Sequence, residues 1–200
     1  MNLKLKVDQF LRCLGWCVLV QTLCTTSSSA DGDIEQGKKL SGQCRTCHGS
    51  YGIAQIPIAP NIAGEPEQYI ANQLNAYRSG QRENEIMSVV AKALDDENIQ
   101  HLAKWYASQA INVNVPDESA DHSVIIACGK CHGIDGIALQ ENTPHLAGES
   151  VIYLDTQLKA FRSGKRNHEV MSEVASELSD DQIRKASQWY SAINLQVIQQ

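Results

Sequence analysis

Two hundred residues, 42% hydrophobic and 20% charged, with a mean hydropathy of −0.29, describe a globular chain of one domain or two small ones. The formal net charge is −6, from 17 basic and 23 acidic residues with no basic cluster, which argues against nucleic-acid binding. No run approaches the ~20 apolar residues that a membrane-spanning helix needs.

Positions 1–30 have the layout of a secretory signal peptide. Basic residues precede a short apolar run at 13–24, and the small residues Ser28-Ser29-Ala30 offer a cleavage site before Asp31. We therefore predict a signal peptide over 1–30, with a buried helix or an uncleaved anchor as the alternative. This segment holds three basic residues and one acidic residue, so its removal would change the formal charge from −6 to −8.

A first helix is predicted over 33–47, where it runs into CRTCH at 44–48, and the same spacing recurs as CGKCH at 128–132. Helix positions i, i+3 and i+4 share one face, so two thiols and an imidazole can meet one flat porphyrin. C-x-x-C-H is the attachment signature of c-type haem. A four-cysteine zinc site, the alternative, would leave both histidines unexplained. We predict covalent attachment of two haem c groups through the four cysteines of the motifs: Cys44, Cys47, Cys128 and Cys131.

The rest of the chain is predicted to be helical throughout. Four further helices have recognisable ends, such as a proline at the start, a glycine after the end or a capping box: 66–79, 95–107, 149–163 and 179–193. No alternation of β-branched residues is long enough to predict a strand.

The sequence also repeats. Positions 44–107 align without a gap with positions 128–191, a constant shift of 84, and 29 of the 64 aligned pairs are identical. This period is too long for a solenoid. We therefore predict two tandem domains with one haem each, at 31–110 and 120–200, joined by a linker at 111–119.

Two methionines are candidate axial ligands. Met87 and Met171 are the only methionines after position 30, and they lie at the same spacing from the histidines of their motifs. A methionine is usually core filler, but here it occurs twice in one register, whereas no other histidine has a histidine at its paired position. We predict iron ligation by His48 with Met87 and by His132 with Met171. With both axial positions filled by protein, electron transfer is favoured over catalysis.

Two prolines and four arginines are candidates for supporting roles. Pro60 and Pro144 each lie twelve positions after the ligand histidine, where a backbone carbonyl could hold the second imidazole N–H, or simply form a turn. Four arginines suit either the haem propionates or a solvated helix end: Arg78, Arg82, Arg162 and Arg166.

These motifs resemble the dihaem cytochrome c4 family, over nearly all of the chain after position 30. The resemblance rests on C-H-G at 47–49, P-x-x-A-G-E at 60–65 and R-S-G-x-R at 78–82, each with its repeat copy, and on the two methionines. It implies an all-α fold of two class I cytochrome c domains related by a pseudo-twofold axis. It also implies a periplasmic carrier, carbonyls of Pro60 and Pro144 on the histidines, and Trp–Tyr pairs at 105–106 and 189–190 against the first helix of each domain.

The second domain departs from the family pattern at its start. Its opening segment is shorter than the usual leading helix, and Gly37 of the first domain is matched by Asp121. The helix crossing that this glycine permits is therefore not expected in the second domain.

Three functions fit the resemblance. The first is a carrier between a membrane quinol-oxidising respiratory complex and a terminal oxidase or reductase, a role compatible with contact at a membrane surface. The second is the cytochrome subunit of an oxidoreductase such as a flavocytochrome c sulfide dehydrogenase. The third, a dihaem peroxidase, needs an openable iron, which the paired methionines oppose. The acidic charge suggests partners with a positive patch.

Overall fold

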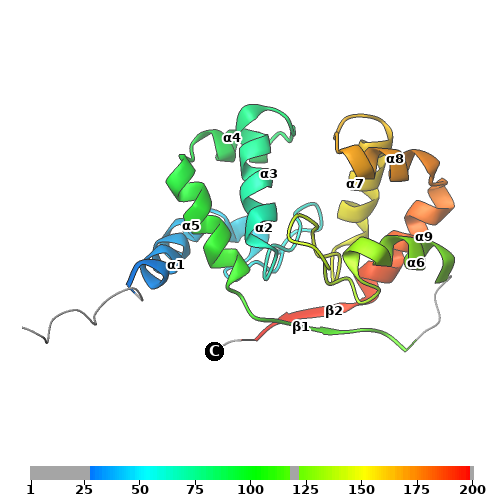
Figure 1. Cartoon of the computed structure of the whole chain (residues 1–200), viewed down its shortest axis with the longest axis horizontal. Helices are drawn as coiled ribbons and strands as arrows, with labels where there is room; N and C mark the ends of the chain where they lie inside the picture. Colours follow the sequence, from blue (N-terminus) through cyan, green and yellow to red (C-terminus); the bar gives the residue numbers. More distant parts are fainter. Residues whose placement is uncertain (1–27, 118–121, 199–200) are drawn as a thin grey trace, which may run out of the picture.

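The computed structural model describes residues 28–117 and 122–198, as two groups of helices side by side above a short two-stranded ribbon (Figure 1). The predicted signal peptide lies outside these residues except for 28–30, which begin the first helix. The described elements are α1 (Ser28–Leu40), the 3-10 helix η1 (Ser41–Gln43), α2 (Arg45–His48), α3 (Glu67–Ser79), α4 (Met87–Lys92), α5 (Asp96–Ala107), β1 (Ile111–Asn114), α6 (His122–His132), α7 (Val151–Arg162), α8 (Glu169–Glu177), α9 (Asp180–Ala192) and β2 (Asn194–Val197).

The first group of helices is built on the crossing of α1 and α5. The two helices approach closely at Gly37, where an added Cβ would lie 2.0 Å from the His101 carbonyl oxygen. Trp105 packs beside this glycine, and Ile99 and Leu102 are almost fully buried in the core beneath. The predicted helix over 33–47 is interrupted, because η1 tightens the chain between α1 and α2.

The second group opens differently. A single helix, α6, leads into the second motif and packs against α9. Val124 and Ile125 of α6 are buried with Tyr190 and Ile193 from the end of the chain. Val113 of β1 also packs on this core, so the segment that follows the first group helps to cover the second.

Most of the predicted helix ends are confirmed. Pro66 precedes α3, and Gly80 ends it with φ of 80° in the left-handed region, which glycine adopts without strain. The capping box of Ser179 and Gln182 starts α9. None of the four ranges predicted from helix ends includes the short helices α4 and α8, which carry the methionines.

The expectation of no strand is wrong at one place, and the reason is the repeat. β1 and β2 are antiparallel, with Ile111 opposite Val197 and Val113 opposite Leu195. Since the repeat makes Ile111 equivalent to Leu195 and Val113 equivalent to Val197, the first of these pairs maps onto the second, and the ribbon is symmetric about the pseudo-twofold axis. A strand only four residues long gains its backbone hydrogen bonds from its own copy in the other domain, which sequence patterning does not reveal.

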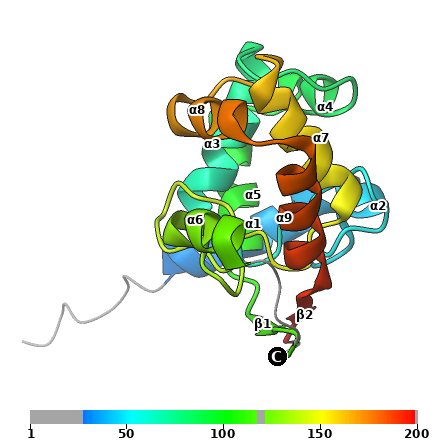
Figure 2. The ribbon, with the colours of Figure 1, turned by 90° about the vertical axis from the view of Figure 1, so that its right-hand side faces the viewer.

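A second contact obeys the same symmetry. Arg82 and Arg166, which are also equivalent in the repeat, form an isolated antiparallel bridge between the loops that follow α3 and α7. The view turned by 90° shows α7 nearer the viewer than α3, and the ribbon of β1 and β2 below the helices (Figure 2). No helix of the described residues is long and apolar enough to cross a membrane.

Candidate haem-binding sites

The histidines of the two motifs are buried and held alike. His48 ends α2 and His132 ends α6, and they are 7% and 8% exposed. The Nδ1 of His48 lies 2.9 Å from the Pro60 carbonyl oxygen, and that of His132 lies 2.9 Å from the Pro144 carbonyl oxygen. Burial lowers the pKa of both imidazoles, against the opposing effect of each proline carbonyl. A neutral imidazole that donates from Nδ1 keeps its Nε2 lone pair for a metal.

The four motif cysteines are free thiols at the same helical turns. Cys44 precedes α2, which contains Cys47, while Cys128 and Cys131 lie in the last turns of α6. Burial raises the pKa of Cys44 and Cys128, which pack against the cores of their domains. Both pairs thus remain available as thiols on the turn that also carries the buried histidine.

The methionines occupy equivalent, capped positions. The Met87 N–H donates to Asn84 Oδ1 at 2.9 Å, and the Met171 N–H donates to His168 Nδ1 at 3.3 Å. Asn84 and His168 are equivalent in the repeat. Both methionines are half-buried, and neither belongs to the hydrophobic core cluster of its domain. Core filling therefore does not account for their position.

Serines that follow the methionines complete each capped segment. The backbone N–H of Asn84 donates to Ser88 Oγ at 3.0 Å, and that of His168 donates to Ser172 Oγ at 3.1 Å. The repeated Met-Ser pair could have indicated that these serines cap the segment before each methionine. This role was not predicted, because the residue that caps the methionine differs between the two copies, Asn84 in the first and His168 in the second.

Arg82 and Arg166 form a cationic network between the domains. Arg82 donates to Gln73 Oε1 at 2.6 Å and to Gln157 Oε1 at 2.8 Å, while Arg166 donates to the same two oxygens at 3.1 and 2.7 Å. Their remaining partners are tyrosine hydroxyls and aromatic faces. Within 28–117 and 122–198, neither guanidinium forms an ion pair, although Arg82 is 8% exposed.

A buried cation without a carboxylate partner is expensive. An anionic group at the junction would offset this cost, and haem propionates supply such a charge. The donor set therefore fits haem: two thiols, an imidazole and a thioether in each domain, with two guanidiniums between the domains. Arg82 and Arg166 are not the solvated helix ends that were their alternative interpretation.

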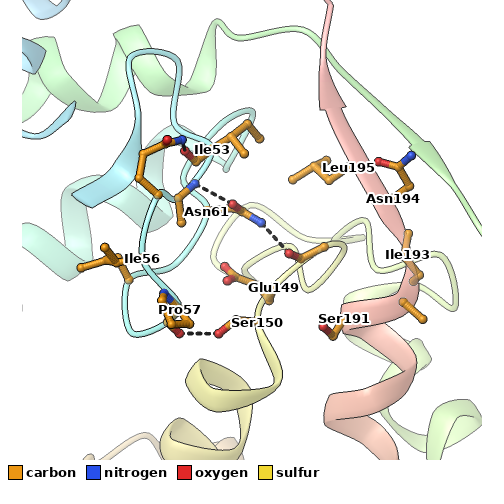
Figure 3. A pocket seen from close by; sticks show the side chains of 15 residues that line it. Ile53, Ile56, Pro57, Asn61, Glu149, Ser150, Ser191, Ile193, Asn194 and Leu195 are labelled. Atoms are coloured by element: carbon orange, nitrogen blue, oxygen red, sulfur yellow. Dashed lines mark hydrogen bonds between the residues drawn. The ribbon is translucent and has the colours of Figure 1, made fainter. Parts of the chain in front are cut away.

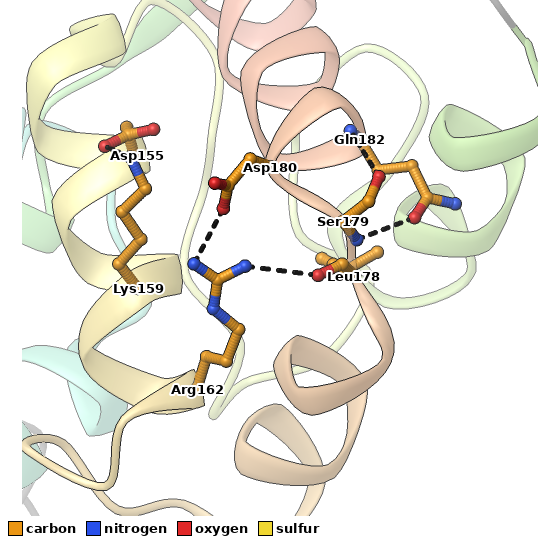
Figure 4. A network of polar contacts seen from close by, with 7 residues as sticks. All are labelled: Asp155, Lys159, Arg162, Leu178, Ser179, Asp180 and Gln182. Atoms are coloured by element: carbon orange, nitrogen blue, oxygen red, sulfur yellow. Dashed lines mark hydrogen bonds and ion pairs between the residues drawn. The ribbon is translucent and has the colours of Figure 1, made fainter.

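Arg78 and Arg162 belong to a different structural feature. Arg162 joins α7 to the start of α9 by donating to Asp180 Oδ1 at 2.7 Å and to the Leu178 carbonyl at 3.3 Å (Figure 4). Arg78 makes the equivalent contacts with Asp96 and the Leu94 carbonyl. These arginines tie two helices of one domain together at a partly solvated position.

The Trp–Tyr pairs lie near the motifs in both domains. Trp105 packs beside Gly37 of α1, as the resemblance implied. In the second domain the pair packs on α6 through the core that holds Val124 and Ile125. It also contacts the turn after the motif: Trp189 Nε1 donates to the Ile134 carbonyl at 3.0 Å, and the Tyr190 hydroxyl donates to the Gly133 carbonyl at 3.1 Å.

Residues next to the prolines connect the two domains reciprocally. Asn61 accepts from the Ala54 N–H at 2.9 Å and donates to the Gly148 carbonyl of the second domain at 2.9 Å (Figure 3). Its repeat counterpart, His145, accepts from the Ala138 N–H and lies 2.9 Å from the Gly64 carbonyl of the first domain. Sequence reasoning assigned no role to Asn61 or His145, since an Asn–His pair is not an identity in the repeat.

Two buried glutamates lie at this connection, and both belong to the repeated A-G-E motif. Glu65 and Glu149 are each 3% exposed. Burial raises the pKa of both carboxyl groups well above the ordinary value, opposed by backbone N–H groups. Glu149 also borders a cleft of about 460 Å³ between the domains, which contains none of the predicted haem ligands (Figure 3).

The paired C-x-x-C-H turns, the helical domains around them and the symmetric contacts between them define a c-type cytochrome with two domains in tandem. No family model matches the chain. The chain is 32% identical to cytochrome c4 of Thiocapsa roseopersicina, over 82% of this chain and 94% of that one. It therefore belongs to the dihaem cytochrome c4 family, and it is an electron-transfer protein rather than an enzyme.

Two further similarities extend this result. The chain is 33% identical to the thiosulfate dehydrogenase electron acceptor of Thiomonas intermedia, over 74% of this chain and 77% of that one. The crystal structure of reduced cytochrome c4 from Pseudomonas stutzeri superposes with a TM-score of 0.70 at 25% identity, covering 80% of this chain and 98% of that one. The predicted all-α fold of tandem cytochrome c domains is confirmed, with the short ribbon of β1 and β2 as an addition that was not predicted.

Proposed function

We propose that each domain binds one haem c through its own motif. Cys44 and Cys47 attach the first haem, and His48 and Met87 ligate its iron. The second domain uses the equivalent residues: Cys128, Cys131, His132 and Met171. The observation that supports this assignment best is the identical 2.9 Å hydrogen bond from each histidine to its proline carbonyl.

Each bound haem supplies one reversible electron transfer between Fe(III) and Fe(II). The histidine of each domain, held by its proline carbonyl, and the methionine, whose backbone N–H is capped, would hold the iron from positions that the fold already fixes. The thioether favours Fe(II) and raises the potential. These residues suit a carrier that exchanges electrons at its surface.

We propose that the protein works in the periplasm, between a membrane quinol-oxidising respiratory complex and a terminal oxidase or reductase. The leader-like segment at 1–30 and the covalent haem motifs support export. The acidic formal charge of −6 supports redox partners with a complementary positive patch.

A second candidate is the acceptor or cytochrome subunit of a periplasmic oxidoreductase. The similarity to thiosulfate dehydrogenase electron acceptors from two organisms favours a sulfur-oxidising dehydrogenase as donor. Stopped-flow reduction of the oxidised holoprotein tests both candidates, with thiosulfate dehydrogenase plus thiosulfate in one arm and a quinol-oxidising complex plus quinol in the other. Faster reduction in the first arm would identify the dehydrogenase, and not the respiratory complex, as the electron donor.

Intact mass tests the number of haems. The mass of the mature holoprotein should exceed that of its polypeptide by two haems, and the haem should survive acid-acetone extraction because it is thioether-linked. A gain of one haem or none would contradict the assignment of one covalent haem to each motif.

Replacement of the methionines tests the axial ligands. Met87→His and Met171→His should each remove about half of the weak near-red band of a methionine–Fe(III) bond. Each should also lower the potential of its own haem, because imidazole stabilises Fe(III) more than a thioether does. If both variants keep the full band and unchanged potentials, the sixth ligands lie elsewhere.

A further inference from the structure

One peptide group lies between a buried glutamate and the histidine of the other domain. The Pro144 carbonyl accepts from His132 Nδ1 at 2.9 Å, and the N–H of the same peptide group, which belongs to His145, donates to Glu65 Oε2 at 3.0 Å. Glu65 belongs to the first domain, whereas His132 is the predicted haem ligand of the second. The hydrogen bonds therefore run from domain one, through a single peptide group, to the proximal imidazole of domain two.

A second contact fixes this peptide group in place. His145 Nε2 lies 2.9 Å from the carbonyl of Gly64, the residue before the glutamate. The backbone of His145 thus binds Glu65, and its side chain binds the neighbouring Gly64. Glu65 is 3% exposed, and this geometry is shielded from water. Hydrogen bonds in a peptide group polarise one another, so an acceptor at its N–H makes its carbonyl oxygen a stronger acceptor.

A stronger acceptor at the carbonyl makes the imidazole a better donor to iron. Groups that bind the second nitrogen of a ligand histidine raise its basicity and tune the metal. A more basic imidazole stabilises Fe(III) over Fe(II). Glu65 should therefore lower the potential of the haem that the other domain carries.

We propose that Glu65 is a positioning residue for the second domain's haem, acting across the domain boundary through the Pro144–His145 peptide group onto His132. This inference rests on the proposed ligation by His132. It makes domain docking part of what sets the potential of the second haem, so the two haems are not independent modules.

The symmetric arm is weaker. Glu149 of the second domain faces the N–H of Asn61, which shares a peptide group with the Pro60 carbonyl on His48. Burial raises the pKa of Glu149, and this N–H opposes the rise. However, one carboxylate oxygen of Glu149 is buried with no hydrogen-bond partner among the described residues, whereas a Glu65 oxygen accepts from the His145 N–H at 3.0 Å. Substitution of Glu149 should thus shift the first domain's haem, by less than the Glu65 substitution shifts the second.

The test is spectroelectrochemistry of the holoprotein with Glu65→Leu, which removes the acceptor whatever its protonation state. Met87→His serves as background, because it moves the first domain's wave to low potential and leaves the second domain's wave resolved. We expect Glu65→Leu to raise the second domain's midpoint potential and leave the first domain's unchanged. Glu65→Gln, which keeps an acceptor oxygen and conserves volume, should shift the same wave in the same direction by less.

Glu67→Gln is the matched control, because it removes an exposed acid two positions away and should move neither wave. The His132 Nδ1–H signal in NMR spectra of the reduced protein should shift in both Glu65 variants, while that of His48 stays in place. A shift confined to the first domain's wave, or an unmoved second wave in Glu65→Leu with two haems bound, overturns the cross-domain role. Failure of Met87→His to move any wave would instead overturn the ligand assignment itself.

Discussion

The two domains reach the same histidine geometry from different leading helices. In the first, α1 crosses α5 at Gly37, and η1 then turns the chain into α2. In the second, one helix, α6, runs directly into the motif, and Val113 of β1 packs on the core beside it. Both histidines nevertheless lie 2.9 Å from their proline carbonyls. The motif turn and the proline loop therefore define the site, and the leading helix only has to cover the core.

Removal of one haem is the sharpest test of whether each domain forms its haem site from its own motif turn and proline loop. Replacement of both Cys44 and Cys47 by serine should cost the first domain its covalent haem and leave the spectrum of the second largely intact, with an intact mass one haem lower. Replacement of both Cys128 and Cys131 is the reciprocal variant. Joint loss of both haems in either variant would show that the domains cannot mature independently.

The next largest effect should come from the helix crossing. Gly37→Ala places a methyl group 2.0 Å from the His101 carbonyl oxygen, which α1 can avoid only by moving away from α5. We expect a loss of about 3 kcal/mol, confined to the first domain. Hydrogen exchange of α5 peptides should accelerate, while α9 peptides stay protected.

Gly42→Ala provides the control for this substitution, since no atom lies within 4 Å of the added Cβ. It should leave exchange in both domains as in the unaltered protein. Equal acceleration in α5 and α9 after Gly37→Ala would mean that the two domains unfold as one unit.

Substitutions in β1 should destabilise either domain separately, because neighbouring side chains of this strand pack on different domains. Val113 packs on the second core, whereas Ile111, two positions earlier, lies against Gly64 of the first domain. Val113→Ala should destabilise the second domain by about 1 kcal/mol, because it withdraws half-buried methyl groups. Ile111→Ala should act on the first domain instead. Exchange in α9 and α5 peptides distinguishes the two outcomes, and a reversed pattern would contradict the assignment of β1 to both cores.

Sequence patterns predicted what is local and periodic. The motif turns, the ends of α3 and α9 and the proline positions all follow from spacing within one domain. Contacts across the pseudo-twofold axis could not be predicted, because they depend on how two copies dock. The pairing of β1 with β2, the Arg82–Arg166 bridge and the burial of Glu65 all arise there. The repeated A-G-E motif marked the position of that glutamate, but not its partner.

The smallest effect concerns an ion pair that only the first domain can form. Lys104 of α5 donates to Asp33 of α1 at 2.5 Å, and the equivalent positions in the second domain are Gln188 and Asp117, which cannot form the same pair. The hydrogen bond from Lys104 lowers the pKa of Asp33 below its ordinary value of 3.8. Because the folded-state pKa is the lower one, the stabilisation is complete above 3.8 and is lost as the pH falls through the folded value.

Acid should therefore loosen the α1–α5 crossing, so exchange of α5 peptides should rise as the pH drops through this window. Asp33→Asn, which keeps the size of the side chain but not its charge, should flatten that dependence. An identical pH profile in the variant would show that the pair contributes nothing to the first domain's leading helix.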